Sequence, residues 1–143
     1  MLCDNKYNIL AISNCISGNH HDNFELVDKM EHMIESLNKQ HINYHLSHLN
    51  ADSGFDVKKF IEFVNSHKMT ANIKQNKRNQ KKKEREYRYM SEYIYQFRFK
   101  IEVVFAWLDT YKRILIRFEY RARNFMAWLH IAAAMINFRN IFN

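Results

Sequence analysis

The stretch Ile42-Asn-Tyr-His-Leu-Ser-His-Leu-Asn-Ala-Asp-Ser-Gly54 decides the fold class. Its alternating residues 42–50 predict a strand, and the Asp-Ser-Gly that follows predicts a turn. Helical spacing of apolar residues lies on both sides of it, over residues 23–38 and again over residues 57–64. A strand between two amphipathic helices indicates an α/β protein.

Further strands extend this pattern outward in both directions. Residues 1–4 and the apolar, β-branched residues 9–16 predict a hairpin, and residues 69–73 predict another short strand. A hairpin followed by alternating helix and strand favours a mixed sheet flanked by helices. Helices are predicted over residues 91–108 and from residue 120 to the C-terminus, so the chain is expected to end in two long helices.

Composition limits the class of protein. The chain has 143 residues, enough for one domain, and a formal net charge of +7, which indicates a polyanionic partner. The most apolar run, residues 125–136, is shorter than the roughly 20 residues of a bilayer span, so we expect a buried helix and no membrane partner. Cys3 and Cys15 form no disulfide framework, which is typical of a cytoplasmic protein.

One polar stripe stands out on the predicted helix over residues 91–108. Tyr95, Arg98 and Glu102 share a face at helical spacing. The neighbouring stripe is apolar and is expected to face the core; it consists of Ile94, Phe97, Ile101, Val104, Phe105 and Leu108. The spacing fits a carboxylate held for metal binding, but the pattern alone favours an ordinary ion pair between Arg98 and Glu102.

Asp52 poses the same choice. It follows a predicted strand, at the sheet edge where α/β proteins collect ligands, and an acid there can hold a metal. The alternative is a local turn or helix cap, which its position alone favours.

A group of histidines and a basic segment complete the set of candidates. His41, His45 and His48 lie close in sequence, but His45 and His48 would point to opposite faces of a strand, so a zinc site is not expected. Residues 74–88, KQNKRNQKKKEREYR, form either a solvated loop or a phosphate-binding segment, and we favour the second interpretation.

The motif Tyr-x2-Arg-x3-Glu resembles the signature of insertion-sequence transposases of the DDE class. Four further segments are similar to those of the family in the same order along the chain. They are residues 17–22 (SGNHHD), 51–56 (ADSGFD), 74–83 and 101–108 (IEVVFAWL), followed by a similar tail at Tyr111, Lys112, Arg113, Ile114 and Arg117.

The resemblance implies a ribonuclease-H-like fold, and cleavage and transfer of DNA strands in bacterial transposition and recombination. It implies two divalent ions, Mg²⁺ or Mn²⁺, held by acids that include Asp52 and Glu102. Arg98 and Tyr95 would orient Glu102 or contact DNA. The DNA-binding residues would be Lys74, Lys77, Arg78, Lys81, Lys82, Lys83, Lys112, Arg113 and Arg117. The partners would be transposon ends and target DNA in the nucleoid, bound by a homodimer.

The sequence departs from the family pattern at two places. Asp109 stands where a lysine is expected, with Lys112 the nearest substitute. The first catalytic Asp belongs on the first strand of the fold, and Asp4 aligns better with a turn after the second strand. We therefore expect residues 1–143 to be a single catalytic domain truncated at its N-terminus, without its first strand and with impaired activity.

Two other functions are compatible with parts of the pattern. A noncatalytic DNA-binding remnant explains the basic segment and the family resemblance. An unrelated basic RNA-binding or interaction protein explains the basic segment but not the spaced acids.

Overall fold

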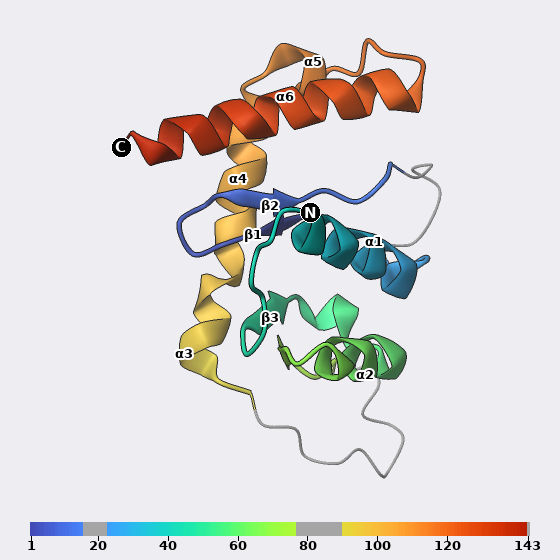
Figure 1. Ribbon diagram of the computed structural model, residues 1–143, viewed down its shortest axis with the longest axis vertical. Helices are drawn as coiled ribbons and strands as arrows, with labels where there is room; N and C mark the ends of the chain where they lie inside the picture. The colour runs from blue at the N-terminus through green and yellow to red at the C-terminus, as the bar shows by residue number, and fades with distance from the viewer. Residues whose placement is uncertain (16–22, 77–89, 143) are drawn as a thin grey trace.

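The computed structural model describes residues 1–15, 23–76 and 90–142, and these form short strands and longer helices (Figure 1). The expected α/β class is confirmed. In chain order the elements are β1 (Leu2–Cys3), β2 (Ile9–Ala11), α1 (Leu26–Lys39), β3 (His48–Ala51), η1 (Ser53–Phe55), α2 (Lys58–Ser66), β4 (Thr70–Ile73), α3 (Glu92–Tyr95), η3 (Gln96–Phe99), α4 (Lys100–Asp109), α5 (Lys112–Leu115) and α6 (Ala122–Ile141).

β1 and β2 form the predicted hairpin, with Leu2 opposite Ala11 in an antiparallel pair. Asp4 builds its turn, because its carboxylate accepts hydrogen bonds from the backbone N–H of Lys6 at 2.7 Å and of Asn8 at 2.9 Å. β2 ends at Ala11, earlier than the apolar, β-branched run predicts, and the expected strand end at residue 16 lies outside the described residues.

β3 and β4 form a parallel pair with α2 as the crossover between them. The strand predicted to begin at Ile42 is wrong over residues 42–47, which are turn and loop. Leu46 has a left-handed φ of 62° and is 86% exposed, and its N–H donates to the carbonyl of Lys68 at 2.8 Å. Ile42 and Tyr44 still pack against the core, so the apolar alternation there belongs to a turn and not to a strand.

The described strands form two separate two-stranded sheets, where a single mixed sheet was expected. The two sheets are joined by side-chain packing and not by a shared ladder of hydrogen bonds. One core cluster lies among α1, α2, β3 and β4, and the other among α4, α6 and the hairpin. β2 contributes to both, with Ala11 in the first and Ile9 in the second.

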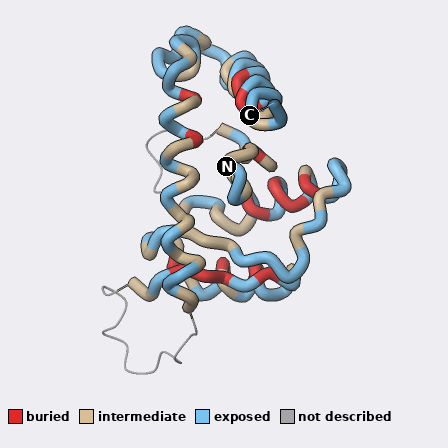
Figure 2. The backbone as a smooth tube through the Cα atoms, turned by 90° about the vertical axis from the view of Figure 1, so that its left-hand side faces the viewer, coloured by how far each residue is buried: buried red, intermediate tan, exposed pale blue. Residues whose placement is uncertain are grey.

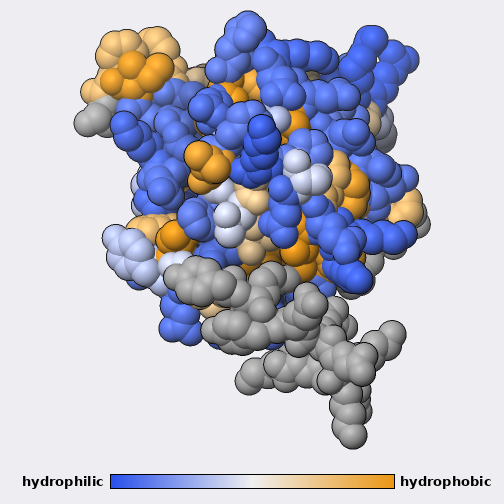
Figure 3. All heavy atoms as spheres, turned by 60° about the horizontal axis from the view of Figure 1, so that its bottom comes forward, coloured by the Kyte–Doolittle hydropathy of each residue, from blue (hydrophilic) through white to orange (hydrophobic). Residues whose placement is uncertain are grey.

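Burial follows these clusters along the chain (Figure 2). Val64 and Ile73 of the first cluster are fully buried, and so is Val104 of the second. On the face seen in Figure 3, hydrophilic residues cover most of the described surface and apolar residues form small groups between them.

The predicted helix over residues 91–108 is a helical run in three parts, α3, η3 and α4. Ser91 caps it, since its hydroxyl accepts from the N–H of Ile94 at 3.3 Å. Val104 and Leu108 are buried as expected. Phe105, predicted to face the core, is 45% exposed, because α4 is covered along a narrower stripe than the pattern suggested.

α6 crosses the upper end of α4 in Figure 1 and buries Ala132, Ala133 and Ile136. Asn137 ties it to β2: its amide donates to the carbonyl of Ile9 at 2.8 Å and its carbonyl accepts from the N–H of Ile9 at 2.7 Å. No helix in the described part of the chain is both long and apolar enough to cross a bilayer.

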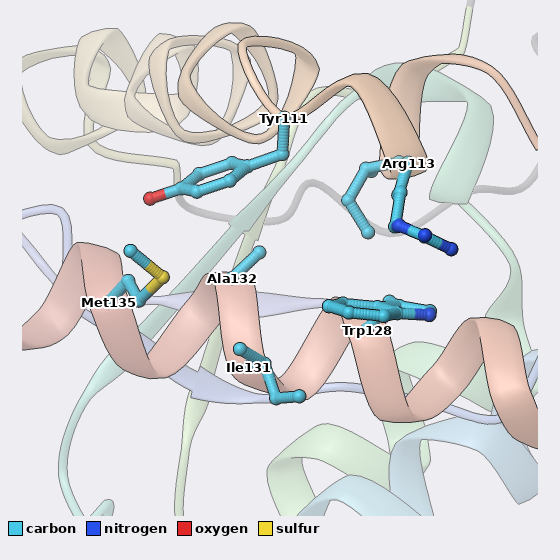
Figure 4. Close-up of a pocket in the computed structure, with 7 residues that line it drawn as sticks. Tyr111, Arg113, Trp128, Ile131, Ala132 and Met135 are labelled. Carbon is cyan, nitrogen blue, oxygen red and sulfur yellow. The ribbon is translucent and has the colours of Figure 1, made fainter.

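α5 lies in the segment predicted as a link, and it packs over α6. Tyr111 and Arg113 face Trp128, Ala132 and Met135 of α6 across a small cavity of about 90 Å³ (Figure 4). Trp128, expected in the core, is 36% exposed. One face of its ring is covered by the Arg113 guanidinium, 4.7 Å from its centroid, and not by the apolar core.

Candidate active site

Asp52 directly follows β3 and occupies the N-cap position of η1. Its backbone carbonyl accepts from the N–H of Phe55 at 2.9 Å, which closes the turn. Its side chain makes no capping hydrogen bond, so the carboxylate does not have the helix-cap role that its position alone favoured. That carboxylate is 61% exposed and is directed to a different element.

Arg98 of η3 brings the predicted site residues together. Its Nη1 lies 2.5 Å from Asp52 Oδ1 and 3.8 Å from Glu102 Oε1, so one guanidinium contacts both carboxylates. The Arg98 guanidinium carbon lies 5.3 Å from the centroid of the Tyr95 ring. The pair predicted between Arg98 and Glu102 is therefore present, but it is the longer of the two contacts.

The helical run positions this group. η3 carries Arg98, and Glu102 follows in the first turn of α4, where a negative charge interacts favourably with the helix dipole. The side chains of Arg98 and Glu102 are 39% and 68% exposed. The site is thus an open surface on which two carboxylates from distant parts of the chain converge on one cation.

A third acid does not join them among residues 1–15, 23–76 and 90–142, where no group of three or more His, Cys, Asp or Glu side chains is arranged to bind a metal. Both carboxylate oxygens of Asp4 accept hydrogen bonds inside the hairpin turn, Oδ2 from the Asn8 amide at 2.8 Å. His41, His45 and His48 are exposed, and the His45 ring packs against Tyr44 with centroids 4.8 Å apart.

The predicted DNA-binding residues lie in two places. Lys74 is exposed immediately after β4, while Lys77, Arg78, Lys81, Lys82 and Lys83 lie outside the described residues. Lys112 is exposed on α5, and Asp109 is exposed at the end of α4.

Arg113 and Arg117 have contacts within the chain. The Arg113 guanidinium lies 3.2 Å from the Glu119 carboxylate, which also accepts from Trp128 Nε1 at 3.2 Å. Arg117 Nε donates to the carbonyl of Glu119 at 3.1 Å. These arginines therefore help to hold α5 and the following loop against α6.

Two polar residues near the site were missed by sequence reasoning. Asn50 and Asn72 are paired across β3 and β4, and Asn72 is only 1% exposed. The available signal was an asparagine inside the apolar strand Ala71-Asn72-Ile73, since a buried amide needs hydrogen-bond partners.

Comparison with known proteins identifies a family for this chain. The family model of the transposase DDE domain matches residues 2–138. A search of curated proteins and a search of solved structures each gave no match. The family match spans nearly the whole chain, so this chain belongs to the family of DDE transposases.

Proposed function

We propose that this protein is a transposase whose Asp52 and Glu102 hold divalent cations for cleavage and transfer of DNA strands. The observation that carries the proposal is the convergence of both carboxylates on Arg98, from segments that lie far apart in the sequence. An ordinary helix-surface ion pair would involve Arg98 and Glu102 alone. The family match supports the same reaction class.

The residues present fit Mg²⁺ or Mn²⁺. Magnesium is commonly bound by one or two carboxylates, with waters and substrate phosphates completing its shell. Asp52 and Glu102 supply hard oxygen ligands, and their exposure leaves room for water and for a DNA backbone. Bound there, the metal would polarise a phosphodiester and lower the pKa of an attacking water or 3′-hydroxyl.

The chain's own groups have separate roles in this proposal. Arg98 holds the two carboxylates near each other and, being permanently charged, can also bind a phosphate oxygen. The Tyr95 ring restricts the Arg98 guanidinium by stacking. Lys74, Lys112 and the basic residues 77–88 would bind the DNA backbone, which positions the strand without reading its sequence.

We also infer a ribonuclease-H-like arrangement for the catalytic domain. It is supported by the antiparallel hairpin, the parallel pair β3–β4 and the acidic residue at the end of β3, in that chain order.

A DNA-nicking assay tests the proposal. In the presence of Mn²⁺, the protein is expected to nick supercoiled DNA that carries the element's ends. Asp52→Asn and Glu102→Gln are each expected to abolish nicking, because each removes a metal-binding charge. The melting temperature should change little, because exposed ion pairs contribute only about 0–1 kcal/mol.

Glu62→Gln is the matched control for these variants. Glu62 is an exposed acid that pairs with Lys58 at 3.7 Å on α2, and its neutralisation should leave nicking unchanged. Nicking that persists in both Asp52→Asn and Glu102→Gln would contradict the assigned roles.

A noncatalytic DNA-binding protein is the second candidate. It is favoured by the finding that only two acids converge within the described residues. The second function would be supported over the first if the protein binds DNA, does not cleave it in the presence of Mn²⁺, and binds it equally well with and without Mn²⁺.

A further inference from the structure

Asn50, which is partly buried, and Asn72, which is buried, form a polar pair close to the candidate active site. They face each other in the parallel ladder of β3 and β4. The Asn72 amide donates to Asn50 Oδ1 at 2.8 Å. Asn72 is almost completely buried, so its remaining hydrogen-bonding capacity must also be met by protein groups.

The start of the α3–η3–α4 run supplies those partners. Asn72 Oδ1 accepts from the N–H of Ser91 at 2.8 Å, and its Nδ2 donates to the carbonyl of Ser91 at 3.1 Å. Asn50 Nδ2 donates to the carbonyl of Ile94 at 3.1 Å. The two asparagines therefore make three hydrogen bonds to the backbone of the N-terminal turn of this helical run. We call this set of hydrogen bonds the clamp.

The start of the helical run lies outside both core clusters. In the described chain, neither core cluster includes a residue of α3 or η3, although Ile101, Val104 and Leu108 of α4 belong to the second cluster. The helical run is thus packed in the core at its α4 end and attached to β3 and β4 by hydrogen bonds at its α3 end. Arg98 lies between these two attachments.

We propose that Asn50 and Asn72 are positioning residues that set the distance between Asp52 and the pair Arg98 and Glu102. Asn50 lies on β3, which Asp52 directly follows, and Ile94 precedes Arg98 on the same helical run. The clamp therefore joins the two segments directly beside the place where their charged side chains meet. This inference rests on the proposed function, because the distance matters if the two carboxylates share a metal.

Spin-label distance measurements test the clamp directly. In a Cys3→Ala, Cys15→Ala background, nitroxides are attached at Lys59→Cys on α2 and Phe99→Cys on η3, both exposed positions. Asn50→Ala and Asn72→Leu are each expected to broaden the distance distribution between the labels. Each is also expected to weaken Mn²⁺ binding about tenfold, a typical effect of removing a group that orients the metal ligands.

Asn137→Leu is the matched control. Asn137 makes the same kind of amide-to-backbone clamp, but between α6 and Ile9. Its removal should lower the melting temperature and leave both the label distance and Mn²⁺ affinity unchanged. A control that broadens the distribution equally would overturn the positioning role, because removal of any such clamp would then have the same effect.

Asn50→Ala is the decisive variant if Asn72→Leu does not fold, since Asn50 is only partly buried and alanine adds no bulk. An unchanged distance distribution in Asn50→Ala would overturn the inference. Absence of Mn²⁺ binding by the unsubstituted protein would instead overturn the proposed function, and the label distances would still report on the clamp.

Discussion

Arg98 joins two segments of the chain through contacts that contribute little to stability. Its contacts with Asp52 and Glu102 are exposed, so screening by water and salt leaves them worth about 0–1 kcal/mol. Two carboxylates held side by side would repel each other without a cation. The guanidinium offsets that repulsion, and under the proposed function it would keep the pair together until a metal binds.

The sequence could predict which residues form this group but not how they meet. Tyr95, Arg98 and Glu102 are spaced for one helix face, and Asp52 follows a strand, so each was identified from local pattern. The short contact between Arg98 and Asp52 joins separate segments, and only the tertiary structure brings them together.

Cys3 provides a prediction at the same scale. Burial raises the pKa of its thiol, and the charge of Asp4 adds to the increase, while the amino terminus and Lys100 oppose it. The thiolate is the reactive form, so iodoacetamide should alkylate Cys3 more slowly in the folded than in the unfolded chain at pH 8. Peptide mass spectrometry measures both rates.

The same shift affects stability. Because the folded pKa is raised, Cys3 stabilises the fold below the thiol's ordinary pKa, and this contribution is lost as pH rises through the raised value. Equal alkylation rates in the folded and unfolded chain at pH 8 would contradict the burial of this thiol.

At the scale of elements, helices were predicted better than strands. α1, α2 and α6 each begin within a few residues of the expected position, because their apolar spacing is sustained over several turns. The strand expected from Ile42 failed, since a turn around Leu46 can show the same short alternation. The 3₁₀ segment η3 has no distinct sequence pattern, and so a continuous α-helix was expected there.

The basic segment gives the prediction at this scale. Replacing Lys81, Lys82 and Lys83 with Ala should weaken DNA binding and reduce the slope of log affinity against log salt by about 1 for each phosphate that is no longer neutralised. Fluorescence anisotropy at several salt concentrations measures the slope. Lys39, Lys58 and Lys59 replaced together remove the same charge from α1 and α2, and this control should retain the slope of the original protein.

At the scale of the whole molecule, an apolar stripe of α6 remains uncovered. Ile131, Met135 and Phe138 are 51%, 54% and 63% exposed. Exposed apolar patches favour association, so we expect the protein to self-associate as its concentration rises, with sedimentation velocity as the measurement. Phe138→Lys should shift the equilibrium towards the monomer, whereas Leu46→Lys, at an exposed loop position, should not.

Sedimentation as a monomer at every concentration would contradict this prediction and the expected homodimer together.

The division into two small sheets also belongs to this scale. It could not be predicted from sequence, because strand pattern identifies strands without specifying which of them share a ladder.

The contribution of β2 to both core clusters has a consequence for thermal unfolding of the molecule. Ile9 packs in one core cluster and Ala11 in the other, and Asn137 fastens α6 to the same strand. Neither cluster can come apart without exposing part of the other. Heating should therefore produce one cooperative transition, in which the calorimetric and van't Hoff enthalpies agree.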